Sequence, residues 1–176
     1  PFGLLSWSVV HNGEISSYGI NRRYLQNFDY HCNLQTDTEV ITYLVDLLGR
    51  KHQIRIPYLG SVLASPFWHE IDLMPEPEKT FYRSLRIIYG GALLNGPFSI
   101  IVGFEQGMFG LVDRIKLRPM VAAWKDSTFY LSSEESAIRE IAPELDEIRP
   151  LQAGEVVSGQ VGEKINYGKK CFVSRI

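Results

Sequence analysis

The main spacing of apolar residues changes at about residue 98, and that change limits the folds open to this chain. Before Phe98 the apolar residues recur at helical spacing, whereas after it they come in short runs typical of strands. Helical segments followed by consecutive hairpins favour an α+β domain with antiparallel sheet beneath helices, rather than a doubly wound parallel sheet. A chain of 176 residues is long enough for one such domain with a real core.

Helical spacing predicts three helices, at residues 17–25, 37–48 and 78–89. The second opens on the capping-box pattern Thr36-Asp37-Thr38-Glu39 and ends at Gly49. Either Ser16 or Ser17 is expected to cap the first helix. Several prolines lie between residues 51 and 78, so we expect short helical pieces or a loop excursion there.

Strand spacing predicts two antiparallel hairpins, at residues 98–112 and 120–131. A shorter strand at Trp7–His11 precedes the first helix. It runs into Asn12-Gly13, a pair that readily takes the positive φ angles of a tight turn. We therefore expect the chain to turn at this pair.

The last part of the chain is expected to hold one helix and one strand. Ser132 and Glu135 form a further capping-box pattern, for a helix that ends at Pro143. The strand is expected at residues 154–158. Aromatic residues alternate along the expected strands of residues 98–131, so core packing explains them better than a platform for stacking bases.

Charge and cysteine usage exclude several classes of partner. The formal net charge is −2 and basic residues are interspersed with acidic ones, which argues against nucleic acid or an anionic membrane as a partner. The longest apolar stretches contain glycines and fall short of the ~20 residues that a bilayer span needs. Cys32 and Cys171 belong to no CxxC or Cys/His cluster, and the histidines share no metal-ligand spacing. We expect a cytoplasmic protein with neither a disulfide framework nor a metal site.

Two short stretches carry residues suited to acyl-transfer chemistry. His11-Asn12-Gly13-Glu14-Ile15 lies at the end of the first expected strand, and Thr36–Ile41 lies at the start of the second expected helix. The side-chain amide of Asn12 and the backbone N–H of Gly13 are donors of the kind that stabilise a developing oxyanion. Asp37 is a natural counter-charge for the α-ammonium group of an amino-acid substrate, and Glu14 is placed to assist it.

Each stretch also has an explanation that needs no ligand. Asn-Gly is the commonest short hairpin signal, so Asn12-Gly13 taken alone indicates a turn. A carboxylate in a first helical turn interacts favourably with the helix dipole, and Asp37 would contribute ~0.3–1 kcal/mol to stability in that way. Asp113, Arg114 and Arg118 are candidates for a structural ion network near the pocket.

Taken together, the two stretches resemble class II glutamine amidotransferases, whose nucleophile is the N-terminal residue. In that family a strand ending in HNGEI and a later TDTEVI that enters a helix flank the glutamine pocket. The resemblance continues through the segments Leu94–Ile101, Asp113–Pro119, Ser132–Glu135 and Gly154–Val157, and so covers nearly the whole chain. Pro66-Phe67-Trp68 and Met74-Pro75 make the chain most similar to the amidotransferase domain of glutamate synthase in its archaeal-type form.

The resemblance implies a fold and a role for each candidate residue. The fold is an αββα four-layer sandwich of two antiparallel sheets between helices, with the domain at residues 1–158 and a strand or linker tail at residues 159–176. In the family an N-terminal Cys attacks glutamine, and water then hydrolyses the γ-glutamyl thioester. Asn12 and Gly13 match the oxyanion hole, and Asp37 matches the carboxylate that binds the substrate α-amine. Glu14 is a secondary substrate contact, and His11 is expected to orient the backbone.

The chain departs from the family pattern at the nucleophile. Residue 1 is Pro, and both cysteines are internal. The upstream Arg that holds the substrate α-carboxylate in this family has no counterpart in residues 1–176; Arg22 and Arg23 come too late. We therefore expect the N-terminal Cys segment of the domain to be cleaved, absent from these residues or on another chain. This fragment should then be inactive alone, with an unpaired strand edge.

The expected partners follow from the same resemblance. L-Glutamine is the substrate, and ammonia passes to a synthase domain or subunit that in glutamate synthase condenses it with 2-oxoglutarate. No cofactor is expected in this domain, because FMN and an iron–sulfur cluster would belong to the glutamate synthase partner. The alternative is a catalytically degenerate relative that binds glutamine as a regulatory or interaction subunit.

Overall fold

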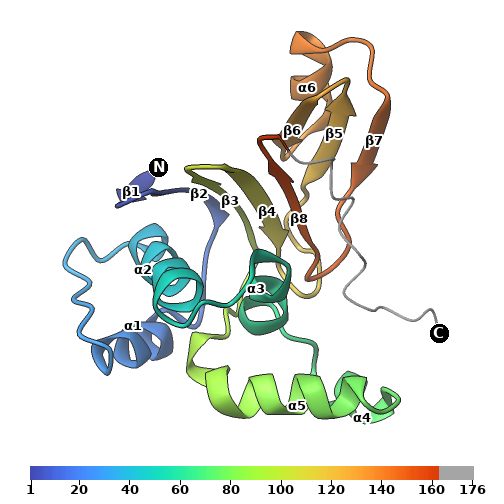
Figure 1. The fold of residues 1–176 in the computed structure, drawn as a ribbon. Helices are drawn as coiled ribbons and strands as arrows, with labels where there is room; N and C mark the ends of the chain where they lie inside the picture. The colour runs from blue at the N-terminus through green and yellow to red at the C-terminus, as the bar shows by residue number, and fades with distance from the viewer. Residues whose placement is uncertain (163–176) are drawn as a thin grey trace.

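A computed structural model of the chain describes residues 1–162, and Figure 1 shows how its elements are arranged. The strands are β1 (Phe2–Leu4), β2 (Trp7–Gly13), β3 (Phe98–Phe104), β4 (Gly107–Val112), β5 (Val121–Lys125), β6 (Thr128–Ser132), β7 (Glu147–Pro150) and β8 (Val156–Gln160). The α-helices are α1 (Tyr18–Gln26), α2 (Asp37–Val45), α3 (Ile56–Leu63), α4 (Trp68–Leu73), α5 (Glu78–Tyr89) and α6 (Glu135–Ile141). A π-helical segment (Asp46–Lys51) continues α2, and a 3-10 turn (Gly90–Ala92) follows α5.

The strands form two antiparallel sheets. The larger has the order β1-β2-β3-β4-β8, and the smaller has the order β6-β5-β7. In the larger sheet β2 pairs with β3 so that Val9 faces Val102 and Gly13 faces Phe98. The β3-β4 and β5-β6 hairpins are those that the sequence predicts, and both sheets are antiparallel as expected.

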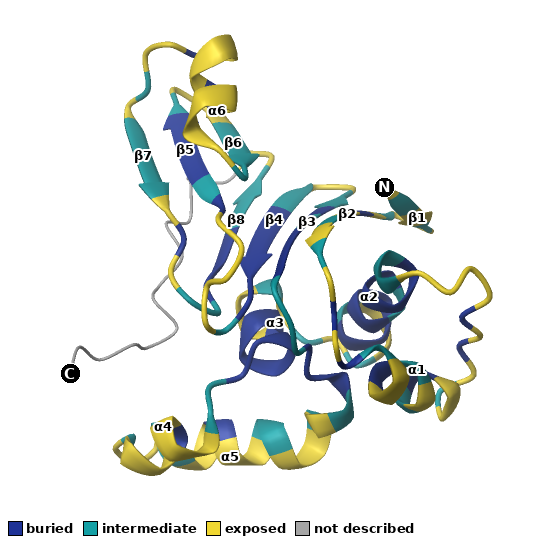
Figure 2. Ribbon diagram, turned by 180° about the vertical axis from the view of Figure 1, so that it is seen from behind, coloured by how far each residue is buried: buried dark blue, intermediate teal, exposed yellow. Residues whose placement is uncertain are grey.

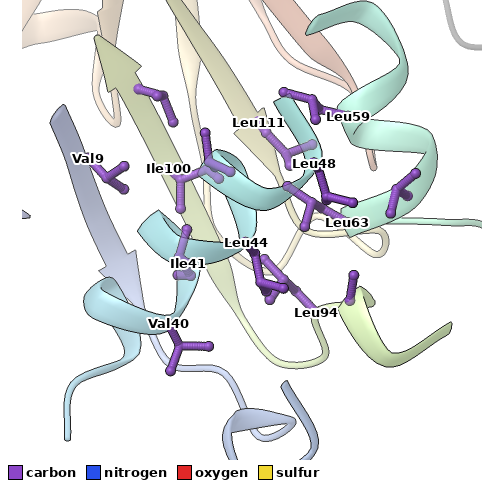
Figure 3. Close-up of a cluster of buried hydrophobic side chains, with 14 of the residues drawn as sticks. Val9, Val40, Ile41, Leu44, Leu48, Leu59, Leu63, Leu94, Ile100 and Leu111 are labelled. Atoms are coloured by element: carbon purple, nitrogen blue, oxygen red, sulfur yellow. The ribbon is translucent and has the colours of Figure 1, made fainter. Parts of the chain in front are cut away.

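The main core lies between the larger sheet and the helices α1 to α3. Side chains alternate across a strand, so Ile100 and Val102 share one face of β3 and Ile101 lies on the other. Ile100 and Val102 are fully buried in a cluster with residues of α2 and α3. Figure 3 shows this packing, in which Ile41 and Leu44 of α2 and Leu59 and Leu63 of α3 approach Val9, Ile100 and Leu111 of the sheet. Burial of these apolar faces is the main stabilising contribution to the layer.

A second core joins the two sheets. Ile101 and Val157 of the larger sheet pack against Trp124 of the smaller sheet and against Met120, which directly precedes β5. Glycine permits this close approach, because a Cβ at position 159 would lie 2.6 Å from the ring of Phe129. The two sheets therefore stack face to face.

A fourth layer covers the far face of the smaller sheet. Ala123 lies between two residues of the second core along β5, so its side chain points to the opposite face, and it is buried there. Ile138 of α6 is also buried, and α6 packs against β6. The order of layers is helices, sheet, sheet and helix, which confirms the expected αββα fold class.

The capping signals explain where α2 starts but not where it ends. Thr36 is the N-cap, and its hydroxyl accepts a hydrogen bond from the backbone N–H of Glu39 at 3.2 Å. The carboxylate of Glu39 completes no capping box; it accepts from the backbone N–H groups of Asn33 and Leu34, at 2.9 Å each. The predicted end at Gly49 is wrong, since the π-helical segment runs through it to Lys51.

Three other local predictions need correction. Asn12-Gly13 is not a hairpin turn, because β2 continues through both residues, which pair with Ser99 and Phe98. Ser17 is the N-cap residue of α1, yet its hydroxyl does not cap the helix and instead accepts from the backbone N–H of Asn95 at 2.9 Å. In α6 the N-cap is Glu134 and not Ser132.

The prolines between residues 51 and 78 divide that stretch as predicted. It forms the short helices α3 and α4, and α5 begins at Glu78. Helices α4 and α5 lie at the outer side of the helical layer, and Figure 2 shows that most of their surface is exposed.

The strand expected at 154–158 is β8, which begins at Val156 and continues to Gln160. The rest of the expected tail, residues 163–176, lies outside the described residues. Among residues 1–162, no helix has both the length and the apolar character that a membrane crossing requires.

Candidate functional site

Gly13 ends β2 in a conformation that demands glycine. Its φ angle is 138°, and a Cβ there would collide with the carbonyl oxygen of Pro97. The next residue, Glu14, donates its backbone N–H to that same carbonyl at 2.9 Å. The backbone is therefore held tightly against the start of β3 at the point where it leaves the sheet.

Asn12 lies on the face of the larger sheet that is turned toward the smaller sheet. It is paired with Ser99, and its neighbour Val10 is paired with Ile101, which belongs to the core between the sheets. At β2 this face is not covered, because Asn12 is exposed and Val10 is 49% exposed. The amide of Asn12 is therefore accessible to a ligand.

Asp37 connects the two sequence motifs in space. It is the first residue of α2, and its Oδ2 accepts a hydrogen bond from the backbone N–H of Ile15 at 2.9 Å. This contact spans 22 residues of sequence and places the carboxylate against the end of the His11–Ile15 stretch. The structure thus brings together two stretches that the sequence could only suggest were neighbours.

His11 faces the helical layer, on the opposite side of the sheet from Asn12. It is half-buried and is paired with Ile100, and its Nε2 atom is buried without a hydrogen-bond partner among residues 1–162. Burial lowers the pKa of His11; the charge of Asp37 opposes this shift and the charge of Arg118 adds to it. The lowered pKa of His11 favours the neutral form of the imidazole.

Glu14 is exposed, and Gly13 lies between Asn12 and Glu14 without a side chain. Asn12 is the last residue before Gly13 in β2, and Asp37 contacts Ile15, two residues after Gly13. A ligand that met both would have to reach past the backbone of Gly13 and Glu14.

Asp113 stabilises the backbone beside the candidate site, a role that the expected ion network did not predict. Its buried carboxylate accepts the backbone N–H of Phe98 at 3.3 Å, of Ile115 at 3.1 Å, of Leu117 at 2.9 Å and of Arg118 at 3.0 Å. The ion network with Arg114 and Arg118 is thus wrong, because backbone amides satisfy this carboxylate. Phe98 pairs with Gly13, so Asp113 braces the strand against which Gly13 is held. An Asp before a short loop is the signal that could have predicted this role.

Cys32 does not fit the role of an activated nucleophile in the described site. Cys32 is buried, and burial together with the nearby Glu39 raises the pKa of its thiol. Cys171 lies outside the described residues. Among residues 1–162, no group of three or more His, Cys, Asp and Glu residues is arranged to hold a metal ion.

Comparison with known proteins adds information on relatives. No protein-family model matches the chain. Over 161 residues it is 50% identical to an uncharacterized protein of Archaeoglobus fulgidus, and the match covers 92% of the chain and 43% of that protein. A protein of Methanothermobacter thermautotrophicus whose name describes it as a glutamine amidotransferase is 30% identical over 149 residues, which are 85% of the chain and 39% of that protein. The chain is similar to a glutamine amidotransferase.

The chain spans less than half the length of these two curated relatives. One solved structure, a glutamine phosphoribosylpyrophosphate amidotransferase of B. subtilis, matches with a TM-score of 0.46 and 14% identity, over 90% of the chain and 30% of that protein. That likeness is too distant to bear on the fold. The sequence relatives support a glutamine amidotransferase-like domain.

The site of this amidotransferase-like domain offers two chemical features. One is a side-chain amide donor at the exposed end of a strand, and the other is a carboxylate beside the backbone that follows it. Donors that are fixed before a reaction begins stabilise a developing negative charge better than water does. An acid beside them can hold a substrate through its ammonium group.

Proposed function

We propose that this chain is the glutamine-binding and oxyanion-stabilising part of a class II glutamine amidotransferase, which hydrolyses L-glutamine to glutamate and ammonia. The single observation that carries the proposal is the hydrogen bond between Asp37 and the Ile15 N–H, since it sets the acid beside the strand end that bears Asn12 and Gly13. The similarity to a relative named as a glutamine amidotransferase supports it.

In this proposal each group has one role. The amide of Asn12 and the backbone N–H of Gly13 donate to the carboxamide oxygen of glutamine as negative charge develops on it. Asp37 uses one oxygen to fix Ile15 and presents the other to the α-ammonium group of the substrate. Glu14 adds negative charge near that ammonium, and His11 holds the strand end from the helical side.

In this proposal the nucleophile is the N-terminal Cys of the family that the motifs resemble. A Cys thiolate adds to the side-chain carbonyl carbon of glutamine, its own α-amine passes the proton to the leaving nitrogen, and the C–N bond breaks to release ammonia. Water then cleaves the γ-glutamyl thioester to give glutamate and the free thiol. Residues 1–176 alone should bind glutamine weakly and release no ammonia.

We further propose that the ammonia passes to a synthase partner of the glutamate synthase type. The residues that support this subfamily, Pro66-Phe67-Trp68 and Met74-Pro75, lie at or next to the two ends of α4 in the helical layer. FMN and an iron–sulfur cluster would then lie in the partner and not in this domain.

The test uses the natural protein that contains this sequence, with glutamate and ammonia release and glutamine affinity measured in parallel. Asn12→Ala should lower turnover by ~10²–10³ while glutamine affinity stays within a few-fold, as expected when an oxyanion donor is lost. Ser8→Ala is the matched control, because Ser8 is an exposed residue on the same face of β2. Unchanged turnover in Asn12→Ala would reject the proposed oxyanion hole. Glutamine binding without any hydrolysis would favour the degenerate binding subunit.

A further inference from the structure

Two arginines from distant parts of the chain meet around residues 65–68, between the first core and α4. Arg86, on α5, donates from Nη1 to the carbonyl of Pro66 at 2.7 Å. Arg114, which follows β4, donates from Nη1 to the carbonyl of Ser65 at 3.5 Å and from Nη2 to Oδ1 of Asn95. Both arginine side chains are half-buried.

One aromatic ring packs against a flat face of each guanidinium group. Arg86 lies over the ring of Trp68 at 4.3 Å from the ring centroid, and Arg114 lies over the ring of Phe67 at 4.1 Å. A guanidinium group carries five N–H donors on its edge. Hydrogen bonds within residues 1–162 use one such donor of Arg86 and two of Arg114. One face of each guanidinium group is therefore covered by a ring, while most of the edge donors remain for a ligand.

The positive charge of this pair is not balanced by an ion pair within the described part of the chain. Elsewhere arginines do form such pairs, for example Arg50 with Asp46 at 2.6 Å and Arg149 with Glu155 at 2.8 Å. Burial lowers the pKa of Arg86, and the charge of Arg114 lowers it further. Burial also lowers the pKa of Arg114, although Glu70 opposes that shift. The two guanidinium groups bind the carbonyls of the adjacent residues Pro66 and Ser65, so two like charges lie in one partly desolvated place, where an anion would relieve their repulsion.

The same segment carries a buried hydroxyl. Ser65 is 1% exposed, and its Oγ has no hydrogen-bond partner among residues 1–162. Buried polar groups in native proteins nearly always have a partner, so the unsatisfied hydroxyl of Ser65 needs an explanation. The backbone carbonyl of the same residue contacts Arg114.

We propose that Arg86 and Arg114 form a binding site for a small oxyanion, a carboxylate or phosphate group bridged between the two guanidinium edges. Arginine is suited to this task, because its planar fork matches the spacing of two oxygens on one such group. One guanidinium group comes from α5 and the other from the loop after β4, and the aromatic rings fix the orientation of both.

This site is separate from the glutamine site, although the two share a supporting segment. Arg114 binds Asn95, and two residues later the carbonyl of Pro97 accepts the N–H of Glu14. None of the proposed catalytic or substrate-binding residues contributes to the anion site. The proposal therefore stands or falls independently of glutamine hydrolysis.

The experiment titrates the natural protein with inorganic phosphate and, separately, with succinate, at constant ionic strength set by sodium chloride. Binding is followed by calorimetry and by the rise in Tm. We expect saturable binding of at least one of the two probes, and the one that binds identifies the chemistry as phosphate or carboxylate. Arg86→Gln and Arg114→Gln should each weaken that binding ~10-fold or more, because each removes hydrogen bonds from a charged donor.

Arg83→Gln is the matched control. Arg83 lies on the same helix, is exposed and lies 3.9 Å from Asp72, so its loss should leave binding unchanged. Arg86→Lys keeps the charge and should bind more weakly than the natural protein even if Arg86→Gln fails to fold, since lysine lacks the fork. Absence of saturable binding of both probes to the natural protein would overturn the proposal. So would unchanged affinity in both Arg86→Lys and Arg114→Gln.

Discussion

The carboxylate of Asp37 and the backbone N–H of Ile15 form a 2.9 Å hydrogen bond that ties the start of α2 to the residue two places beyond the end of β2. It gives Asp37 a structural role in addition to the proposed role in substrate binding. The two roles can be separated, because the structural one needs an acceptor atom and the binding one needs a negative charge.

Asp37→Asn should weaken glutamine binding ~10-fold or more with little loss of stability. The Asn side-chain carbonyl can still accept from Ile15, but the counter-charge for the α-ammonium group is gone. Asp37→Ala should lose the same affinity and in addition ~1 kcal/mol of unfolding free energy. Calorimetry with glutamine and urea unfolding measure the two effects. Equal glutamine affinity in Asp37→Asn and the natural protein would mean that Asp37 serves only the start of the helix.

Gly13→Ala should destabilise the protein by at least ~1–3 kcal/mol and abolish glutamine hydrolysis. At a φ of 138° a Cβ is strained and would collide with the Pro97 carbonyl, so the strand end must move away from β3. Gly19→Ala is the control, because a Cβ at Gly19 in α1 meets nothing within 4 Å. That control should be neutral or stabilising by up to ~1 kcal/mol. Urea unfolding curves compare the two variants, and similar stabilities would contradict the assigned constraint.

Asp113→Ala should cost ~3–5 kcal/mol of unfolding free energy, because it leaves several backbone N–H groups without their acceptor. Asp113→Asn should cost less, since one acceptor oxygen remains. Hydrogen exchange gives a local readout: the amides of Leu117 and Arg118 should lose protection in Asp113→Ala before global unfolding. Retained protection of those two amides would show that the loop does not depend on the carboxylate.

The stability of the protein should decrease as pH falls below about 4, partly through Asp46. This carboxylate is 1% exposed and accepts from Arg50 Nε at 2.6 Å, from Arg50 Nη2 at 2.7 Å and from the hydroxyl of Tyr30. Burial raises the pKa of Asp46, but the hydrogen bonds from Arg50 and Tyr30 outweigh burial, and the pKa lies below its usual range. A lowered folded-state pKa adds stability above the unfolded pKa, and this contribution is lost as pH falls through the folded one.

Unfolding free energies measured between about pH 2 and pH 7 test this sign. Asp46→Asn should be less stable than the natural protein at pH 7, and its stability should fall less steeply below pH 4. Asp29→Asn, at an exposed position nearby in the sequence, is the control and should keep the slope of the natural protein. A slope in Asp46→Asn as steep as that of the natural protein would contradict the prediction.

Local sequence signals predicted most of the elements. The helices α2 and α5, the division of residues 51–78 and both hairpins follow from spacing, capping and proline placement. The same signals missed β1 and β7, which are three and four residues long and gain their strand character from pairing with β2 and β5. A short strand has too few residues to display a period, so only its partner defines it.

The candidate site divides in the same way. The sequence alone indicates Asn12, Gly13 and Asp37 as candidates, since an amide, a glycine and an acid at the ends of elements are suited to binding a ligand. The sequence does not predict how these residues lie relative to one another, because hydrogen bonds and strand pairing join residues far apart in the chain. The Asn12-Gly13 pair shows the limit: its local preference is for a turn, and pairing with Ser99 and Phe98 keeps it in a strand.

The sequence by itself determined the succession of helices and strands and the residues able to do chemistry, because periodicity and capping act over a few neighbouring residues. Only the tertiary structure decided that Asp37 reaches Ile15, that Asp113 braces Phe98 and that Arg86 and Arg114 both bind the segment at residues 65–66. Each of these depends on how sheets and helices pack, which is settled by the burial of apolar faces across the whole domain and not by any one segment.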